Sequence, residues 1–294
     1  MGNFFQYPTH SQEDLKWGLI LKTLGHTVIP PGSSYPPLEH PKSYQFDALK
    51  TRSVSEYQIV YITSGKGLFE AENGIKHGVM PGTVFLLFPG VTHRYYPNIE
   101  TGWTEYYIGV EGAIMDNFLN IGFLSVNHPI LQVGTREGLL RHYKEIFQLA
   151  KNEKKGWQQA ASGAVIHLIG DLMYLINNQN TDSSTERIIE NIKAHISENL
   201  TEKINWEKIS KNNGVSYSKL RKLFKSYMGM TLSEYLIQVR ITEAKLLLAK
   251  SNDPIKHIAV DTGFQNEYYF NRMFKKMVGV APGMFRSQMI FKND

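Results

Sequence analysis

The sequence predicts an α+β protein with two domains, a β-barrel followed by helices and then an all-α domain. Between residues 44 and 111, short β-branched and aromatic runs alternate with turns that contain glycine or proline. After about residue 112, apolar residues recur at the 3.6-residue period of helices instead. A unit of two short helices occurs twice near the C-terminus, and 294 residues are enough for two domains.

Two strands and three turns are the clearest signals in the first domain. Tyr57–Thr63 is β-branched and aromatic, and Thr83–Phe88 is strongly apolar. Turns at Pro81-Gly82 and Pro89-Gly90 bracket the second of these strands. Asn73-Gly74 predicts a hairpin with a type I′ turn, because both central residues of that turn have positive φ. Short strands at this spacing are typical of a small sandwich or barrel.

The segment before the predicted barrel, residues 17–41, is rich in proline and aromatic residues. The sequence leaves two interpretations of it open. It could be an arm that lies over the barrel, or it could be an extended segment at the barrel edge.

Two amphipathic helices are predicted between residues 136 and 178, where apolar side chains recur at helical spacing over 139–150 and 164–176. They could close the open end of the barrel, or they could form the face of a homodimer. The polar stretch 179–185 has no period and is predicted to be a linker. The predicted domains are therefore residues 1–178 and 186–294.

The positive charge of the chain is concentrated in the second domain. Residues 186–294 hold 18 Lys and Arg against 11 Asp and Glu, a net charge of +7, whereas residues 1–185 have a net charge of −2. A basic segment beside a slightly acidic one indicates that only the basic one meets a polyanion. The absence of cysteine excludes disulfides, thiolate metal sites and cysteine nucleophiles.

Neither a secretory signal nor a membrane span is expected. The N-terminal residues have neither a basic nor an apolar stretch, and Gln6 stands where a myristoylation signal needs Ser or Thr. No apolar run approaches the ~18–20 residues that span a bilayer. The sequence therefore predicts a soluble cytoplasmic protein without a membrane partner.

The same unit occurs at residues 205–229 and 254–279. Each copy predicts two short helices at a sharp angle, because Gly214 or Gly263 stands where a left-handed residue ends the first helix. Ser216 and Asn266 are the predicted N-caps of the second helices. The matching positions, 50 residues apart, are Leu220 and Phe270, Leu223 and Met273, Phe224 and Phe274, Lys225 and Lys275, and Gly229 and Gly279.

The second helix of each copy has one apolar face, and its opposite face suits the major groove of double-stranded DNA. Arginine pairs with guanine and asparagine with adenine, while lysine mainly contacts phosphate. A helical bundle with basic surface helices would explain one copy equally well, but it explains two copies poorly. The residues predicted to bind DNA are Ser216, Ser218, Lys219, Arg221, Lys222, Lys225, Asn266, Glu267, Tyr268, Asn271, Arg272 and Lys275.

One helix is predicted to join the two copies. Thr231–Glu234 is a capping box, and the helix that it opens runs to about Lys250. At 1.5 Å per residue, about 18 residues give a rod of roughly 27 Å, near the ~34 Å repeat of B-DNA once the flanking turns are added. Asp253 and Pro254 predict the N-cap and the first position of the next helix. The rod would hold both recognition helices in successive major grooves.

Residues 186–290 resemble the DNA-binding domain of the AraC/XylS family of bacterial transcription regulators. Two positions depart from the pattern of that family, since Phe285 replaces the usual tyrosine and Ser210 replaces the usual alanine. Both are packing positions, so neither changes the expectation of DNA binding. The resemblance rests on Ile258, Ala259, Gly263, Phe264, Tyr269, Phe270, Arg272, Phe274, Lys275, Lys276, Gly279, Pro282 and Arg286.

The β region resembles the cupin-like effector domain that precedes many DNA-binding domains of this family, through residues 57–67, 81–90, 93–95 and 102–103. Catalytic cupins usually hold a metal through an H-x-H cluster, a glutamate and a distant histidine. No histidine lies within residues 44–67, and the histidines at positions 77 and 93 stand alone in the sequence. No metal, cofactor or enzymatic activity is therefore expected.

A ligand pocket inside the barrel is predicted. Alternation along the strand after residue 102 places Trp103, Glu105 and Tyr107 on one face. By resemblance to sugar-binding members of the family, Tyr95, Glu105 and Tyr107 match pocket positions, and Arg52 is the candidate for a basic one. These aromatic residues could equally be packing residues of the barrel. The predicted ligand-binding residues are Arg52, His93, Tyr95, Trp103, Glu105 and Tyr107.

The expected function is that of a transcription regulator controlled by a small molecule. Its expected partners are double-stranded DNA and an effector, which the resemblance suggests is a carbohydrate. A homodimer formed by the helices at 136–178 would bind paired sites near a promoter, where RNA polymerase is a further expected partner. Two alternative hypotheses remain. The protein could be a regulator that needs no ligand, or it could be a cupin enzyme tethered to DNA. The sequence does not indicate whether transcription rises or falls.

Overall fold

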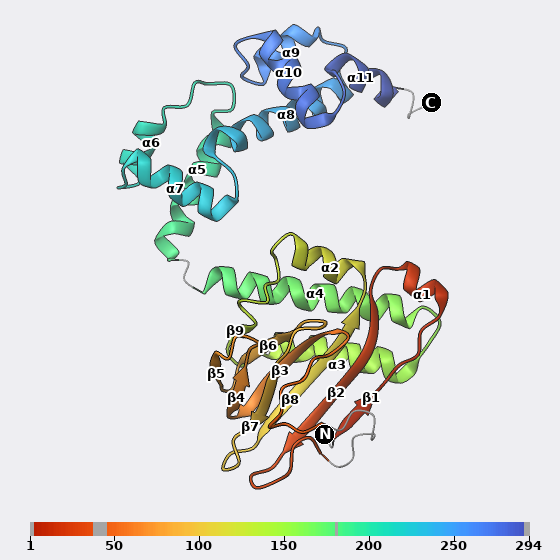
Figure 1. The fold of residues 1–294 in the computed structure, drawn as a ribbon. Coiled ribbons are helices and arrows are strands. Elements are labelled where there is room, and N and C mark those ends of the chain that lie inside the picture. Colours follow the sequence, from red (N-terminus) through yellow and green to blue (C-terminus); the bar gives the residue numbers. More distant parts are fainter. Residues whose placement is uncertain (1–2, 38–45, 180–181, 291–294) are drawn as a thin grey trace. The chain divides into compact units, whose positions relative to one another are not determined.

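The computed structural model describes residues 3–37, 46–179 and 182–290, and the chain forms two compact units, Met1–Asn180 and Thr181–Asp294 (Figure 1). Helix α5 (Ser183–Glu198) is the first helix of the second unit, and it includes the last three residues of the predicted linker, 183–185. The side chain of Asp182 accepts a hydrogen bond from the backbone N–H of Ser184. This N-cap turns the last polar residues of the stretch into the first turn of α5.

Two antiparallel sheets form the body of the first unit. The larger sheet has the strand order β1-β2-β8-β3-β6-β9, and the smaller has the order β5-β4-β7. All neighbours pair antiparallel. The strands are β1 (Phe4–Gln6), β2 (Ile20–Ile29), β3 (Tyr57–Gly65), β4 (Gly67–Glu70), β5 (Lys76–Val79), β6 (Thr83–Leu87), β7 (Arg94–Pro97), β8 (Trp103–Glu111) and β9 (Ile130–Gln132).

An apolar interior lies between the two sheets. Val60 and Trp103 reach it from the larger sheet and Phe69 from the smaller sheet, and none of the three is more than 2% exposed. The strands predicted over residues 57–63 and 83–88 are β3 and β6 of the larger sheet. The predicted β-rich, cupin-like domain followed by helices is therefore confirmed.

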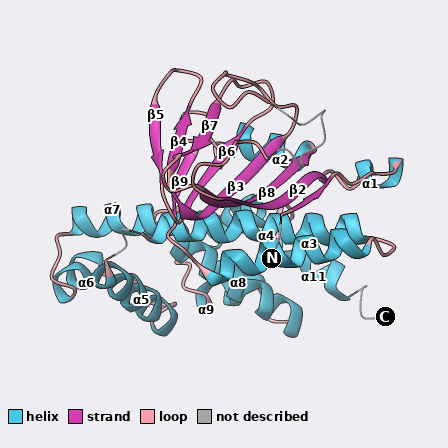
Figure 2. Ribbon diagram, turned by 90° about the horizontal axis from the view of Figure 1, so that it is seen from below, coloured by secondary structure: helices cyan, strands magenta, loops and turns pink. Residues whose placement is uncertain are grey.

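Helices cover the outer face of the larger sheet (Figure 2). Helix α3 (Glu137–Asn152) lies beside α4 (Trp157–Asn178) on this face, and α2 (Ala113–Asn120) joins the same apolar cluster. The short helix α1 (Gln12–Lys16) precedes β2. With helices on one face and the smaller sheet on the other, the larger sheet is buried on both sides. This explains why every residue of β6 is buried.

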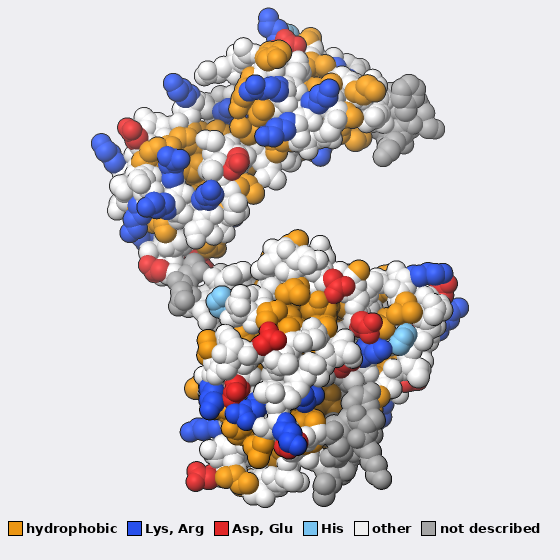
Figure 3. All heavy atoms as spheres, viewed as in Figure 1, with side chains coloured by type: hydrophobic (Ala, Val, Ile, Leu, Met, Phe, Trp, Pro, Cys, Tyr) orange, Lys and Arg blue, Asp and Glu red, His pale blue; other side chains and the backbone are white. Residues whose placement is uncertain are grey.

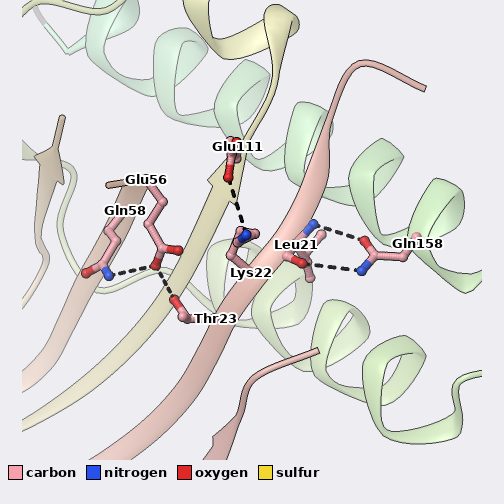
Figure 4. Close-up of polar contacts among 7 residues, drawn as sticks. All are labelled: Leu21, Lys22, Thr23, Glu56, Gln58, Glu111 and Gln158. Atoms are coloured by element: carbon pink, nitrogen blue, oxygen red, sulfur yellow. Dashed lines mark hydrogen bonds and ion pairs between the residues drawn. The ribbon is translucent and has the colours of Figure 1, made fainter. Parts of the chain in front are cut away.

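Strand β2 is not predicted from the sequence, which suggests only an arm or an edge segment there. It lies between β1 and β8, inside the sheet, and polar contacts fix it from both sides (Figure 4). The Gln158 side chain of α4 accepts from the backbone N–H of Leu21 at 3.0 Å and donates to its carbonyl at 3.3 Å. The buried Glu56 accepts hydrogen bonds from Thr23 at 2.6 Å and Gln58 at 2.9 Å.

Lys22 of β2 also forms an ion pair with Glu111 of β8 at 3.4 Å (Figure 4). The amide and carboxylate contacts satisfy polar groups that would otherwise be buried without partners. Residues 38–41, the end of the proline-rich segment, lie outside the described residues.

The hairpin at Asn73-Gly74 is present between β4 and β5, but its turn is not the predicted type I′. Gly74 has a φ of 76°, whereas Asn73 is not among the residues with positive φ. The N–H of Gly74 donates to the carbonyl of Ala71, whose N–H donates to the carbonyl of Ile75. This is a type I turn followed by a left-handed glycine, so only the second residue of the Asn-Gly pair needs positive φ.

The described residues of the second unit form helices joined by short turns and contain both predicted helix pairs. The first pair is α6 (Trp206–Asn212) with α7 (Tyr217–Met228), and the second is α9 (Ile255–Asp261) with α10 (Glu267–Val278). The predicted connecting helix is α8 (Leu232–Lys250), which begins with a capping box of Thr231 and Glu234. Helices α5 and α11 (Pro282–Ile290) complete the cores of the first and second pairs.

The start of α9 differs from the prediction by one position. Pro254 is the N-cap and Ile255 the first helical residue, so Asp253 does not cap this helix. The backbone carbonyl of Asp253 instead accepts a hydrogen bond from Arg286 at 2.6 Å. Because proline offers no side-chain acceptor, α9 begins without a side-chain cap and is held by its buried residues Ile258 and Ala259.

Helix α4 corrects the expectation that no segment approaches the length of a membrane span. Its 22 residues, with a mean hydropathy of 1.3 in the most apolar window, are long and apolar enough to cross a bilayer. The sequence shows no continuous run because His167 and Asp171 interrupt the apolar residues. Val165 and Leu168 are buried in the cluster beneath the sheet, and core helices commonly pass the same test, so this is weak evidence for a membrane.

Candidate DNA-binding surfaces and ligand pocket

The turn inside each helix pair of the second unit is built in the same way. Gly214 has a φ of 68° and Gly263 a φ of 84°, the left-handed conformation that the repeat predicts. The next residue donates its backbone N–H back into the first helix. Val215 donates to the carbonyl of Ser210 at 3.0 Å, and Phe264 donates to the carbonyl of residue 259 at 2.8 Å. The two turns therefore direct α7 and α10 in the same manner.

Both recognition helices begin at the predicted N-caps. The hydroxyl of Ser216 accepts from the N–H of Lys219 at 3.3 Å, and the side-chain oxygen of Asn266 accepts from the N–H of Tyr269 at 3.1 Å. These bonds satisfy helix N–H groups that have no partner within the helix. The two caps thus define the helix ends from which neighbouring side chains project.

One face of each recognition helix is fully buried. Leu220 and Phe224 of α7 and Phe270 and Phe274 of α10 have no exposed surface. The two departures from the family pattern, Phe285 and Ser210, are 7% and 3% exposed, and Ser210 donates its hydroxyl to the carbonyl of Glu207. They are packing residues, as the sequence indicates.

The opposite faces are open to solvent. Of the twelve residues predicted to bind DNA, Asn271 is half-buried and the others are exposed. In the part of the chain that the structure describes, none of the lysines and arginines among them takes part in an ion pair. Figure 3 shows Lys and Arg side chains gathered on the visible face of this unit. These cations are available to phosphate or to base edges.

Aromatic rings support the two arginines. The guanidinium of Arg221 lies 5.8 Å from the ring centre of Tyr217, and that of Arg272 lies 5.4 Å from the ring centre of Tyr269. Such contacts restrict a long side chain and favour a fixed direction of its fork. On α7, Ser218, Arg221, Lys222 and Lys225 also line a groove with residues 231–233 at the start of α8. The sequence does not predict this part of the groove.

In the first unit, a pocket opens into the barrel between the two sheets. Four of the six predicted ligand residues line it: Arg52, Tyr95, Glu105 and Tyr107. Tyr107 and Glu105 alternate with Tyr106, which packs on the helix side of the sheet, so the predicted alternation along β8 holds. The structure adds Tyr7, Thr23, Tyr35, Pro36, Phe46, Gln58 and Val60 to the lining.

Two polar pairs form the chemical centre of the pocket. The hydroxyl of Tyr35 donates to a carboxylate oxygen of Glu105 at 3.0 Å, and a guanidinium nitrogen of Arg52 donates to the hydroxyl of Tyr95 at 2.8 Å. The Arg52 guanidinium also lies 3.7 Å from the ring centre of Phe46. An acceptor and a donor group are thus held inside an aromatic wall.

Burial controls the charge state of this pocket. It raises the pKa of Glu105 to about 7, although the Tyr35 hydrogen bond and the nearby Arg52 oppose the shift. Burial also lowers the pKa of His93 to about 4, and the positive charge of Arg52 acts in the same direction. The Glu105 carboxyl therefore titrates near neutral pH, whereas the His93 imidazole is uncharged at that pH.

His93 and Trp103 are the two predicted ligand residues that do not line the pocket. The ring of His93 stacks on Tyr95, and a ring nitrogen bonds the carbonyl of Val91 at 3.1 Å. Trp103 is 1% exposed and packs edge-on against Tyr35. His93 lines a separate cavity together with Phe69 and Val91, whereas Trp103 packs behind the pocket wall. Alternation along a strand does not distinguish such inward-facing residues from the residues that line the pocket.

The lining residues that sequence reasoning missed come from elsewhere in the chain. Tyr35 and Pro36 belong to the proline-rich segment, Phe46 follows it, and Thr23 lies on the unpredicted strand β2. The aromatic and proline content of residues 17–41 was the available signal, since an arm over the barrel is one of its two interpretations. The structure supports that interpretation for Tyr35 and Pro36.

Both parts of the chain, the barrel with its polar pocket and the repeated helix pair, are similar to domains of known proteins. Residues 31–169 match the family model of the AraC-like ligand binding domain, and residues 209–288 match that of a helix-turn-helix domain. The chain belongs to the AraC family of transcription regulators. It therefore combines a ligand-binding domain with a DNA-binding domain, and neither matching model describes a catalytic domain.

Several AraC-family regulators are similar to this chain over most of its length. It is 24% identical to the lactose operon transcription activator of Staphylococcus xylosus over 240 residues, which are 79% of this chain and 84% of that protein. It is 24% identical over 237 residues to the Msm operon regulatory protein of Streptococcus mutans, with the same coverage of 79% and 84%. The arabinose operon regulatory protein of Escherichia coli is 26% identical over 214 residues, covering 70% and 72%.

Proposed function

We propose that a small carbohydrate bound in the barrel pocket controls this regulator. The pair of buried polar contacts carries the proposal, because Glu105 offers hydroxyl groups an acceptor and Arg52 offers a donor inside an aromatic wall. Aromatic faces suit the apolar C–H faces of a sugar ring. The names of the lactose and arabinose operon regulators among the relatives support a sugar as the effector class.

On the DNA side, we propose that α7 and α10 enter successive major grooves of double-stranded DNA. Support comes from their matching turns, their exposed polar faces and the 19-residue helix α8 that joins the two pairs. The proposed contacts are the twelve exposed or half-exposed residues predicted from the repeat, with Lys on phosphate and Arg and Asn on bases. Ser216 and Asn266 act there mainly as helix caps.

For the switch, we propose a homodimer formed through α3 and α4 that binds paired sites near a promoter, in the cytoplasm, where RNA polymerase is a further partner. A bound sugar would favour one arrangement of the two units over another. A ligand can shift such an equilibrium only by the difference in its affinity for the two arrangements.

Thermal melting of the full chain with a panel of mono- and disaccharides tests the effector. One sugar should raise the melting temperature, and Glu105→Gln, which keeps the side-chain shape but removes the charge, should lose most of that rise. A panel in which no carbohydrate stabilises the chain would contradict the sugar proposal and leave DNA binding untouched.

The alternative hypothesis is a regulator that needs no ligand. It is supported by Trp103 and His93, because these two predicted ligand residues are buried against other side chains and do not line the barrel pocket. It expects operator affinity to be the same with and without every sugar of the panel. Measuring operator affinity with and without the stabilising sugar therefore distinguishes a sugar-controlled regulator from a ligand-independent one. An affinity change would exclude the ligand-independent regulator.

The pH dependence of stability tests the pocket without any ligand. Because the folded-state pKa of Glu105 is raised from 4.5 to about 7, folding takes up a proton between these values. The free energy of unfolding contributed by this group therefore falls as pH rises through that window, by about 3 kcal/mol in total. Glu105→Gln removes this slope, so its stability relative to the wild type should increase from pH 5 to pH 7. Urea unfolding at each pH measures the free energy of unfolding of both proteins. If the two free energies changed equally with pH, the Glu105 carboxyl would carry no burial penalty.

A further inference from the structure

A cluster of two histidines and one aspartate lies on the helices that cover the sheet, outside the barrel pocket. His142 belongs to α3, and His167 and Asp171 lie one turn apart on α4. One potential ligand atom from each of the three lies within 4.8 Å of the other two. Figures 1 and 2 show α3 and α4 running side by side, which brings residues 25 or more positions apart together.

The carboxylate of Asp171 lies between the two imidazoles. One of its oxygens is 2.6 Å from Nε2 of His142, and the other is 3.8 Å from Nε2 of His167. The ring centres of the two histidines are 4.4 Å apart. Two ligand atoms bound at 2.0–2.1 Å to a tetrahedral ion lie about 3.4 Å apart, so small side-chain rotations would bring all three into coordination.

A hydrogen bond between His142 and Asp171 accounts for only part of this arrangement. That hydrogen bond does not explain why the His167 ring packs against the His142 ring or why Nε2 of His167 faces the same carboxylate. The His167 side chain is 68% exposed, so water could satisfy its ring nitrogens instead. Nδ1 of His142 is buried and has no hydrogen-bond partner in the described part of the chain. Nε2 is thus the only nitrogen of the His142 ring with a polar neighbour in that part of the chain, and it faces the Asp171 carboxylate.

We propose that His142, His167 and Asp171 bind one divalent transition-metal ion of the zinc type. Two imidazole nitrogens and one carboxylate oxygen form a ligand set that Zn²⁺ accepts, with water in the fourth position. In the single chain Asp171 and His167 are 41% and 68% exposed, so an ion can enter and keep a water ligand, while His142, at 9%, anchors the site. The ligands come from both helices, so the bound ion cross-links α3 to α4.

The site needs no residue of a second copy and shares none with the sugar pocket, so it stands independently of the proposed effector. Because the ion binds the folded helix pair and not the unfolded chain, it stabilises the first unit by mass action. The sequence does not reveal the site, since His142 is 25 residues from His167 and only the packing of α3 on α4 joins them.

Zinc chloride added to the metal-free, tag-free full chain tests the proposal. Equilibrium dialysis should find one zinc per chain that a chelator removes, and zinc should raise the melting temperature. His167→Ala should weaken zinc binding at least tenfold without changing the melting temperature of the metal-free chain, because the ring is exposed. His128→Ala, at an exposed histidine in a loop, is the matched control and should behave as the wild type.

Asp171→Asn separates a metal site from a simple hydrogen-bonded pair. The amide keeps an acceptor for His142 but is a poor zinc ligand, so the variant should lose the zinc-dependent rise in melting temperature. The proposal is overturned if zinc leaves the wild-type melting temperature unchanged, or if His167→Ala binds zinc as tightly as His128→Ala does.

Discussion

The two helix pairs of the DNA-binding unit share one construction, but their glycine turns have different surroundings. A Cβ on Gly263 would lie 2.4 Å from the carbonyl oxygen of Leu200 and 2.7 Å from the guanidinium carbon of Arg240. Arg240 is fixed there because it donates to the carbonyls of Leu200 and Glu202, each at 2.9 Å. A Cβ on Gly214 would meet nothing within 4 Å. The second turn is therefore built into the centre of the unit, whereas the first lies at its surface.

The recognition helices differ in charge as well. The exposed face of α7 carries serine, lysine and arginine and no acid, whereas α10 combines Glu267, Tyr268 and Asn271 with its cations. A face whose charged groups are all positive suits phosphate and guanine, while a face that also carries an acid and an amide can distinguish more base pairs. If both helices bind DNA as proposed, we expect α7 to contribute more to affinity and α10 more to sequence discrimination.

The largest expected effect separates the two turns. Gly263→Ala should destabilise the second helix pair by about 2–4 kcal/mol, because a left-handed alanine and the clash with Leu200 and Arg240 add together. Gly214→Ala meets only the backbone penalty and should cost about 1 kcal/mol. Hydrogen exchange of peptides from α9 and α10, and from α6 and α7, measures the two effects locally. Equal losses in both pairs would show that the contact around Gly263 has no energetic weight.

The next effect concerns the two arginines that aromatic rings support. Arg272→Ala and Arg221→Ala should each weaken operator binding by ~1–3 kcal/mol and relax selectivity at one base pair. If α10 is the better discriminator, selection from a randomised operator should lose more sequence information with Arg272→Ala. Arg187→Ala, at an exposed position of α5 outside both faces, is the control and should leave the selected sequences unchanged. Unaltered selectivity in both arginine variants would mean that neither contacts a base.

Much of the second unit is predictable because its signals are local. Glycine, N-cap and apolar positions within a few residues determine each turn, and the repeat gives every signal twice. Prediction fails where the local rule has more than one solution. Asn73-Gly74 forms a hairpin through a type I turn, and Pro254 takes the capping position in place of Asp253.

The pocket and the histidine cluster are less predictable because long-range packing creates them. Strand β2 is stabilised by its neighbours and by Gln158 of α4, 137 positions from Leu21, so its own pattern is weak. Alternation identifies Glu105 and Tyr107 as inward residues, yet it cannot separate them from Trp103, which packs behind the wall. Tyr35 reaches Glu105 from a segment 70 positions earlier. No local pattern contains that contact.

The smallest expected effect concerns the lysines at equivalent positions of the two helices, Lys225 and Lys275. Each should contact phosphate, so Lys225→Ala and Lys275→Ala should weaken binding to all sequences alike and lower the slope of log affinity against log salt by about 1. Lys154→Ala, at an exposed position of the first unit, is the control. Titrations at several salt concentrations measure the slopes. If only one of the two variants changes the slope, only that helix reaches the DNA backbone, and the similar construction of the two pairs does not extend to similar docking.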